Sequence, residues 1–403
     1  MSRTLGYALV LLCMLVLRAP VQAADDARGA DAAGLRGTGD LALIVERASG
    51  SVLVVDTTRR AVLGRVTGLG DLSHAHAVYS RDARYAFVFG RDGGVTRLDM
   101  LTRRITHRVM QAGNSIGGSI SQDGRVIAVQ NYTPGGIKLL DADTLELLAD
   151  VPSEYGEPVQ RSKVVGLADL PGNRFAAALY DADAIWIVDA STPRTPRVEK
   201  FAGIGRAPYD GFATRDGRYF LAGLFGEDGV ALLDTWQTPL QVRRILAGYG
   251  RGEEKLPVYK MPHLRGWSEA GDDLLLPAIG RHEVLLADKR GFAESGRIAV
   301  RGQPVFVMVQ PGGRRAWVNF AVPDYDRVQV LDIPSRSVIA ELSPGKAVLH
   351  MEFSARGEEV WVSARDSDAV VIYDTRTLQE KGRLVAHEPS GIFMAWPAHQ
   401  MGM

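Results

Sequence analysis

The chain has 403 residues, with 47 basic and 47 acidic side chains. This balance gives no reason to expect nucleic acid or an anionic membrane surface as a partner, because both attract strongly basic proteins. A chain of this length would ordinarily hold two or three domains, but an internal repeat that covers most of it predicts one.

The first residues have the pattern of a secretory signal peptide. Arg3 supplies a positive start, residues 5–17 are apolar and uncharged, and Val21-Gln22-Ala23 has the small residues of a cleavage site. The apolar run ends at Arg18 and is too short to span a membrane. We expect residues 1–23 to be a signal peptide that is cleaved after Ala23. We also expect a flexible leader over residues 24–36 and a periplasmic location.

The single cysteine, Cys13, lies within this signal. A lipid anchor at Cys13 would require a small residue before it, where the chain has Leu12, so anchoring is the disfavoured alternative. Cleavage after Ala23 leaves a mature chain without cysteine. That excludes disulfides, thiolate catalysis and covalent attachment of a c-type haem.

A hydrophobic strand that ends in aspartate recurs along the chain, as in Leu-Val-Val-Asp at residues 53–56 and Val-Ile-Tyr-Asp at residues 371–374. The eight aspartates are Asp56, Asp99, Asp141, Asp189, Asp234, Asp288, Asp332 and Asp374. They lie about 42–54 residues apart, which is the period of a β-propeller with four short strands in each blade. Each carboxylate is expected to cap the backbone of the turn that follows it, a structural role.

Seven blades can be followed in full, over residues 76–109, 117–151, 164–201, 209–245, 263–299, 304–342 and 348–385. Another is split: strands predicted over residues 41–45, 51–55 and 61–66 lack an innermost strand, which residues 391–396 can supply. We therefore predict an all-β, eight-bladed β-propeller over residues 37–403, closed by N- and C-terminal strands in one blade. This closure removes the open edges of the ring.

Two sets of loops are expected to share one face of the propeller. One set leads into the innermost strands, and the other joins the second and third strands of each blade. The longest connections, residues 152–163 and 248–262, belong to the first set, and long loops on a rigid scaffold often carry function. Six of the eight histidines map to these loops or to the strands that begin there, so we expect the functional site on this face.

The side chains predicted on this face combine imidazoles, cations and aromatic rings. The candidates are His74, His76, Arg91, Tyr132, Arg161, Tyr209, His263, Arg265 and Arg301. Together they suit a large, flat, anionic ligand such as a polycarboxylated porphyrin, with histidine on iron and arginines on carboxylates. Taken singly, each histidine can be a polar loop residue and each arginine a solvated cation. Motifs for a nicotinamide site or a serine nucleophile are absent from the sequence.

Two consecutive segments resemble the cytochrome d1 haem-domain family of eight-bladed propellers. They are Gly-Asp-Leu-Ser-His-Ala-His-Ala-Val-Tyr-Ser at residues 70–80 and Arg-Tyr-Ala-Phe-Val-Phe-Gly-Arg-Asp-Gly-Gly at residues 84–94. They are similar to the part of the family that carries the proximal haem d1 histidine and an arginine near the macrocycle. The resemblance covers residues 36–396. It implies His74, or alternatively His76, as the axial ligand of the haem iron, and Arg91 as a carboxylate partner.

Two departures from the nitrite reductases of this family bear on function. Where those enzymes carry His-Asp-Gly on the distal side, this chain has Tyr209-Asp210-Gly211, so the histidine that would help protonate nitrite is missing. The chain also lacks a Cys-x-x-Cys-His motif for an electron-delivering c-type haem. A d1-type site without its own electron supply favours biosynthesis, chaperoning or transfer over respiration.

The resemblance thus implies a periplasmic haem d1 biosynthesis protein that binds haem d1, or its dihydro- or propionate-bearing precursor, without a covalent bond. Side-chain processing or dehydrogenation would use His74, Tyr209 and His263 as catalytic groups. The implied partners are a d1-type nitrite reductase and other haem d1 maturation proteins. Two alternatives stay open: a non-catalytic carrier or insertion chaperone, and a generic exported propeller that serves as an interaction module.

Overall fold

The structure is a computed structural model that describes residues 37–250 and 266–402. The signal peptide, the leader and Cys13 lie outside these residues, so they stay predictions. The regular structure in the described ranges is almost entirely strand, with two short 3-10 turns, η1 (Ile279–Arg281) and η2 (Arg365–Ser367). In this part of the chain no helix is long and apolar enough to cross a membrane.

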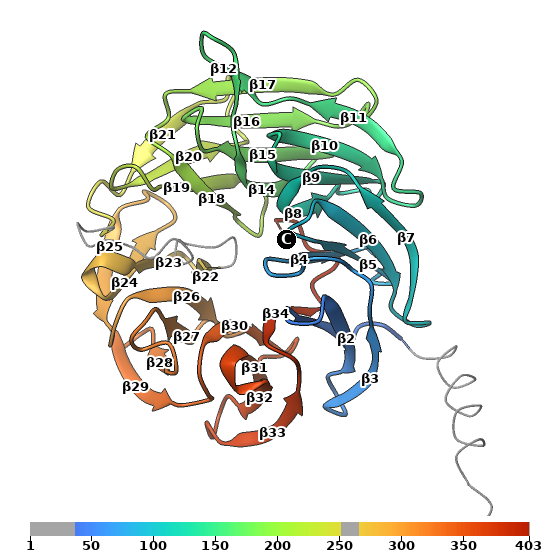
Figure 1. The fold of residues 1–403 in the computed structure, drawn as a ribbon. Helices are drawn as coiled ribbons and strands as arrows, with labels where there is room; N and C mark the ends of the chain where they lie inside the picture. The colour runs from blue at the N-terminus through green and yellow to red at the C-terminus, as the bar shows by residue number, and fades with distance from the viewer. Residues whose placement is uncertain (1–36, 251–265, 403) are drawn as a thin grey trace, which may run out of the picture. The chain divides into compact units, whose positions relative to one another are not determined.

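Eight antiparallel four-stranded sheets follow one another along the described chain as the blades of a ring (Figure 1). From the innermost strand outwards, blade 1 is β34 (Pro389–Met394), β1 (Leu41–Glu46), β2 (Ser51–Asp56) and β3 (Ala61–Val66); blade 2 is β4 (His76–Tyr79), β5 (Tyr85–Phe89), β6 (Gly94–Asp99) and β7 (Arg104–Met110); blade 3 is β8 (Asn114–Ile120), β9 (Val126–Thr133), β10 (Gly136–Asp141) and β11 (Leu147–Val151); blade 4 is β14 (Val164–Leu170), β15 (Arg174–Leu179), β16 (Ala184–Asp189) and β17 (Arg197–Ala202). Blade 5 is β18 (Pro208–Ala213), β19 (Tyr219–Leu224), β20 (Val230–Asp234) and β21 (Val242–Ile245); blade 6 is β22 (Ser268–Ala270), β23 (Asp273–Ala278), β24 (Glu283–Asp288) and β25 (Glu294–Ala299); blade 7 is β26 (Pro304–Val309), β27 (Arg315–Phe320), β28 (Val328–Asp332) and β29 (Ser337–Leu342); blade 8 is β30 (Val348–Phe353), β31 (Glu359–Ala364), β32 (Ala369–Asp374) and β33 (Glu380–Val385). The predicted eight-bladed propeller is confirmed.

Blade 1 is built from two distant parts of the chain, as predicted. Strand β34 pairs antiparallel with β1, with Leu43 opposite Phe393. The hydroxyl of Tyr79, at the end of β4, donates a hydrogen bond of 2.6 Å to the carbonyl of Phe393 and so ties the closing strand to blade 2. The ring is therefore closed by β34.

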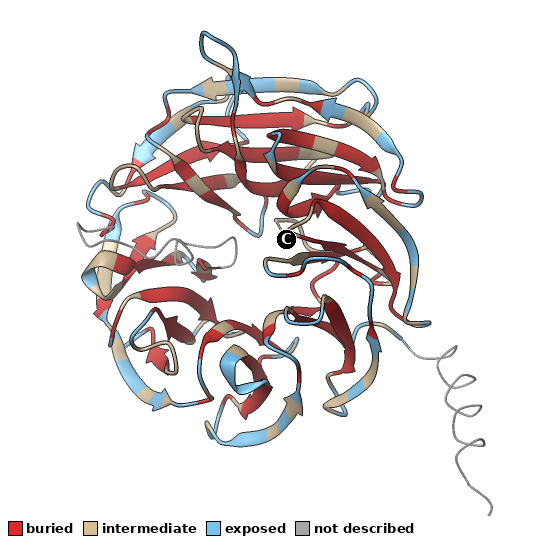
Figure 2. Ribbon diagram, in the orientation of Figure 1, coloured by how far each residue is buried: buried red, intermediate tan, exposed pale blue. Residues whose placement is uncertain are grey.

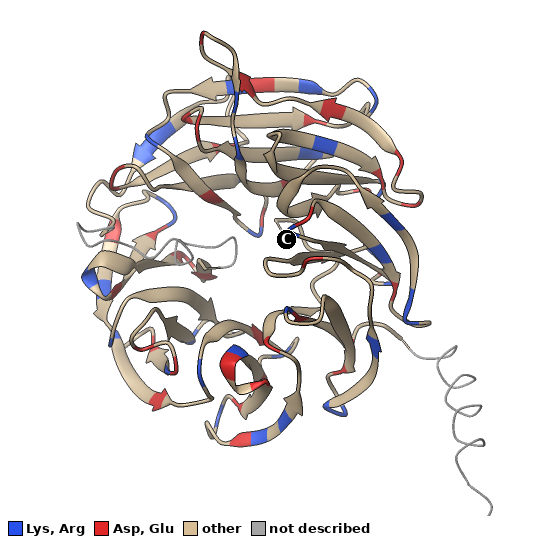
Figure 3. Cartoon of the chain, viewed as in Figure 1, with Lys and Arg blue, Asp and Glu red and all other residues tan. Residues whose placement is uncertain are grey.

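The core lies between neighbouring blades, because successive side chains of a strand point to opposite faces of its sheet. In β1, Leu41 and Leu43 pack against blade 2, whereas Ala42 and Ile44 pack against Trp361 of blade 8. Both faces of such a strand are covered, which explains its continuous apolar sequence. The outermost strands are more exposed and carry mixed charges (Figures 2 and 3).

The repeated aspartates cap turns, as expected from the sequence. Oδ1 of Asp99 accepts the N–H groups of Leu101 and Thr102 at 2.9 and 3.0 Å. Each of the other seven likewise accepts a backbone N–H from the turn after its strand. These carboxylates satisfy backbone donors that would otherwise lack partners, so they hold the third strand of each blade to the fourth.

Candidate functional site

The two sets of loops share one face, which we call the mouth. The loop before β4 meets the loop between β5 and β6, because the N–H of Arg91 donates to the carbonyl of Asp71 at 2.8 Å. Blade 8 repeats this contact, with the N–H of Arg365 on the carbonyl of Ala347 at 3.0 Å. The mouth therefore contains the loops that lead into the innermost strands and the loops between the second and third strands, as predicted from the sequence.

The two histidines of the motif have different surroundings at the mouth. His74 is half-buried in the loop before β4. His76 is the first residue of β4. Its ring centroid lies 6.1 Å from that of the stacked Phe89 ring and 5.5 Å from that of Phe393, which is nearly perpendicular to it. A Cβ on Gly117 would stand 3.4 Å from Nδ1 of His76, so glycine there leaves room for the imidazole. The ring contacts give His76 a packing role, while His74 stays the predicted ligand.

His350 continues the row of rings towards blade 7. Its ring lies 5.9 Å from Phe393 and 5.4 Å from Phe306. Its Nδ1 accepts the N–H of Ile392 at 3.1 Å. His350 therefore helps to hold the closing strand β34 in place.

Arg91 extends from the loop between β5 and β6 over the ring of Tyr132, with its guanidinium carbon 5.4 Å from the ring centroid. Among the described residues its guanidinium makes no hydrogen bond or ion pair. Asp71 is close enough for Arg91 to help lower the pKa of its carboxyl, after the larger effect of the hydrogen bond from Ser73. Arg91 is thus a half-buried cation that keeps its donors available, the property expected of an anion-binding arginine.

Arg47 has the same property, although no motif in the sequence indicated a role for it. It follows β1 in the loop to β2, which is the counterpart in blade 1 of the loop that carries Arg91. Burial lowers the pKa of Arg47, and the neighbouring charge of Arg365 adds to this effect. Within residues 37–250 and 266–402 its guanidinium forms no ion pair or hydrogen bond. Arg47 also acts electrostatically on Asp71, which places it near the His74 loop.

Two tyrosines meet across the blades at the mouth. The hydroxyls of Tyr132 (β9) and Tyr209 (β18) lie 3.4 Å apart. Tyr209 also packs against Tyr180 at 6.1 Å and Phe225 at 6.2 Å between ring centroids. Burial raises the pKa of both Tyr132 and Tyr209. Both phenols are therefore neutral near pH 7 and suit hydrogen bonding or ring contact better than service as a base.

Asp210, next to Tyr209, is a buried carboxyl group for which the sequence suggested no role. It is 4% exposed and lies at an irregularity of β18. Its backbone has a φ of 63°. Its Oδ1 accepts the N–H of Gly211 at 2.9 Å, and burial raises its pKa well above the ordinary range. Asp210 is thus a buried carboxyl group beside the tyrosine pair whose protonated form is favoured by burial.

The remaining predicted residues lie apart from this group or outside the described chain. Arg161 is exposed on the small hairpin of β12 (Glu154–Tyr155) and β13 (Gln160–Arg161), 3.4 Å from a carboxylate oxygen of Glu154. Arg301 already binds Asp324 at 2.7 Å and Glu341 at 3.0 Å. His263 and Arg265 fall outside the described residues. The structure therefore gathers Arg91, Tyr132 and Tyr209 but gives Arg301 protein partners.

The family model named Cytochrome D1 heme domain matches residues 36–397. Two curated relatives, each named Protein NirF, come from Stutzerimonas stutzeri and Pseudomonas aeruginosa. Each is 54% identical over 370 residues, which cover 92% of this chain and 95% and 94% of the relatives. A dihydro-heme d1 dehydrogenase of P. aeruginosa is 27% identical, over 87% of this chain and 70% of that protein.

Solved structures agree on the fold. The dihydro-heme d1 dehydrogenase NirN in complex with DHE superposes with a TM-score of 0.77 at 24% identity, over 91% of this chain and 77% of that one. AztD from Citrobacter koseri superposes with a TM-score of 0.63 at 12% identity, over 87% of this chain and 97% of that one. The resemblance seen in residues 70–94 is thus confirmed over nearly the whole propeller, and the chain belongs to the Cytochrome D1 heme domain family.

Proposed function

We propose that this protein binds a d1-type tetrapyrrole at the mouth, without a covalent bond, as part of haem d1 biosynthesis. The observation that carries the proposal is the pair Arg47 and Arg91. Both are half-buried cations whose guanidinium groups make no ion pair among the described residues, and both flank the loop that carries His74. A ligand with several carboxylates would supply the missing partners.

The other groups of the mouth fit the same ligand. His74 would hold the iron, Arg47 and Arg91 would form bidentate pairs with carboxylates, and the rings of Tyr132 and Tyr209 would contact the macrocycle. The two neutral phenols would donate hydrogen bonds to the ligand. The tetrapyrrole would be cargo or substrate here, and these residues would bind and orient it.

The relatives narrow the choice of ligand. One of them is named for dehydrogenation of dihydro-haem d1 and shares 27% identity over 87% of this chain. This likeness supports the dihydro form of haem d1, or a related precursor, as the ligand of this chain too. We infer a periplasmic site of action, reached through the signal over residues 1–23, and delivery of the tetrapyrrole towards a d1-type nitrite reductase.

Whether the protein changes its ligand or carries it is a second question. Asp210, a buried carboxyl group beside the tyrosine pair with a raised pKa, favours a proton-transfer role in processing of the ligand. In the carrier alternative, binding is tight and the tetrapyrrole leaves unchanged. Mass and absorption spectra of the dihydro form, taken before and after incubation with the protein, separate the two functions.

Optical titration with haem d1 tests binding directly. Addition of the protein should shift the Soret band and saturate at one equivalent, and the haem should leave the protein in denaturant. His74→Ala should alter the spectrum, with His76→Ala as its matched control. A spectrum altered by His76→Ala and not by His74→Ala would reverse the assignment of the ligand. An unchanged Soret band with the unaltered protein would refute the tetrapyrrole proposal and leave the interaction module.

A further inference from the structure

Residues 395–402, which we call the strap, follow the closing strand β34 at the end of the inner strands opposite the mouth. The N–H of Ala395 donates to the carbonyl of Leu41 in blade 1 at 2.9 Å. The indole Nε1 of Trp396 donates to the carbonyl of Phe353, at the end of β30 in blade 8, at 3.0 Å. The strap therefore starts at the blade 8 and blade 1 side of the ring.

The strap ends on the other side of the ring. The N–H of Gly402 donates to Oδ1 of Asp169, near the end of β14 in blade 4, at 3.0 Å. A Cβ on Gly402 would stand 3.0 Å from Cβ of Ala213, the last residue of β18 in blade 5. Blade 5 is four blades from blade 1 in either direction around an eight-bladed ring. The strap thus runs along the inner-strand ends from the blade 1 side to the blade 5 side, at the end of the ring opposite the mouth.

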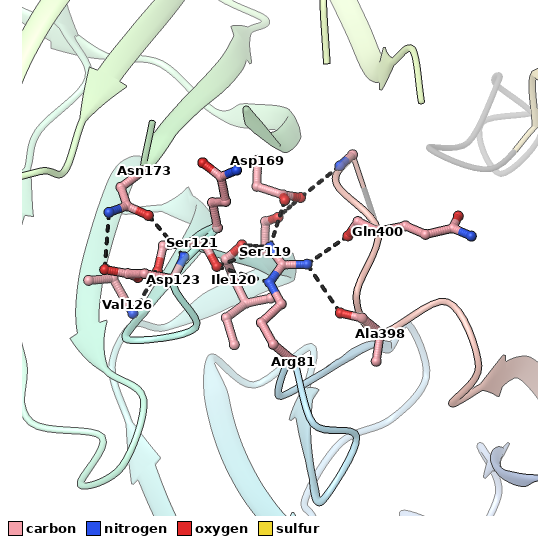
Figure 4. A network of polar contacts seen from close by, with 12 residues as sticks. Arg81, Ser119, Ile120, Ser121, Asp123, Val126, Asp169, Asn173, Ala398 and Gln400 are labelled. Atoms are coloured by element: carbon pink, nitrogen blue, oxygen red, sulfur yellow. Dashed lines mark hydrogen bonds and ion pairs between the residues drawn. The ribbon is translucent and has the colours of Figure 1, made fainter. Parts of the chain in front are cut away.

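Arg81 fastens the strap at its middle (Figure 4). Nη1 of Arg81 donates to the carbonyls of Ala398 at 3.2 Å and Gln400 at 2.6 Å. Nη2 and Nε donate to the carbonyls of Ile120 and Ser121 at the end of blade 3, and Nη2 also pairs with Asp169 at 2.8 Å. A rigid planar donor set is suited to joining several acceptors at once.

Asp169 is the second fixed point. Its side chain is fully buried. It joins Arg81 to the N–H of Gly402 and accepts the hydroxyl of Ser119 at 3.0 Å. Ala398 is itself 7% exposed and packs with Tyr79 and Ala83. The strap is therefore a packed part of the structure. It is held by hydrogen bonds to the ion pair of Arg81 and Asp169 and by apolar contacts.

We propose that the strap partly closes the end of the propeller axis opposite the mouth, so that the central channel typical of propellers is more accessible from the His74 side. Arg81 and Asp169 are the positioning residues of this closure. The proposal concerns access along the axis and does not depend on which ligand binds at the mouth.

A thiol placed beneath the strap tests the closure. Ser119→Cys, in a chain that also carries Cys13→Ser, puts a single cysteine beside Asp169. In the otherwise unaltered chain this thiol should react with a maleimide slowly, as expected for a fully buried group. Truncation after Trp396, which keeps the contact with Phe353, should raise the rate by at least about tenfold while the far-UV circular dichroism stays that of a folded propeller.

Point variants keep the test valid if the truncated chain does not fold. Arg81→Gln should also raise the labelling rate, because it removes the pair with Asp169 and the bonds to the strap. Arg84→Gln is the matched control: Arg84 lies in the same turn and pairs with Asp99 at 2.6 Å, away from the strap. Equal protection of the thiol in all folded variants would overturn the proposal, as would rapid labelling of the unaltered strap or an equal effect of Arg84→Gln.

Discussion

The two ends of the inner strands use arginine in opposite ways. At the mouth, Arg47 and Arg91 are half-buried and make no ion pair among the described residues. At the strap, Arg81 directs its guanidinium nitrogens to four carbonyl groups and one carboxylate. In a chain with equal numbers of acids and bases, a saturated arginine indicates structure, whereas an available one indicates the place of a ligand.

Loss of the closing strand β34 should have the largest effect, because it disrupts both the mouth and the strap. Truncation after Leu384 removes β34, exposes the buried strand β1 as an open edge and deletes the strap. We expect an insoluble or unfolded product, measured by size-exclusion chromatography and circular dichroism. A soluble, monomeric, folded product would refute closure through blade 1. The truncation after Trp396, which retains β34, is its control.

Replacement of Arg91 by alanine should weaken binding of haem d1 by about 1.5–3 kcal/mol, roughly 10–150-fold in Kd, because a charge-assisted bond to a ligand carboxylate is lost. Arg47→Ala should have a similar effect. Arg301→Ala is the matched control, since Arg301 already binds Asp324 and Glu341 and should change Kd little. If Arg301→Ala weakened binding as much as Arg91→Ala, pairing would not distinguish ligand-binding arginines from structural ones.

Asp210→Asn should stabilise the empty protein at neutral pH. The folded-state pKa of Asp210 is raised by burial, so the unfolded chain gains more from ionisation as pH rises above about 4, and stability is lost over that range. Asparagine resembles the protonated acid and removes this loss, by about 1–3 kcal/mol at pH 7. Urea unfolding of both proteins at pH 7 and at pH 4 measures this change in the free energy of unfolding. A gain of the same size at pH 4 would show that ionisation is not the cause.

The smallest effect is expected at the turn that Asp374 caps. The N–H of Thr377 lowers the pKa of Asp374, against a smaller opposing effect of burial. Its contribution is therefore complete above about pH 4 and is lost as pH falls through the lowered folded-state value. Asp374→Asn should cost up to about 1 kcal/mol at pH 7 and progressively less as pH falls below about 4. Thermal unfolding across this range measures the difference, and a cost that does not fall with pH would contradict it.

The sequence predicted the fold well because the repeated pattern arises from interactions between residues close together in the chain. Each aspartate caps its own turn, so its position marks the end of a third strand without knowledge of distant contacts. The apolar strand over residues 41–45 needed a partner, and the apolar residues 391–396 were available to supply it. Period and unmet hydrogen bonds were therefore enough to predict eight blades and their closure.

The site was predicted less completely because the sequence does not show which arginines form ion pairs with carboxylates elsewhere in the chain. Arg301 and Arg91 are both arginines in loops of the mouth, yet Asp324 and Glu341 neutralise the first and no described carboxylate pairs with the second. Arg47 lies in a polar loop that looks solvated in the sequence. Asp210 was identified as a candidate only because the structure buries its carboxyl group. The strap has no periodic pattern, and Arg81 reads as an ordinary turn residue.

The order of strands in blade 1 has a consequence for synthesis and export. Strand β1 lies near the start of the propeller, but its inner neighbour β34 comes after all the other blades have been made. A chain that emerges from its N-terminus first must keep β1 with an unpaired edge until residues 389–394 arrive. Any chaperone that protects the growing chain would have this single strand as its most persistent target, and release of that target would coincide with completion of the ring.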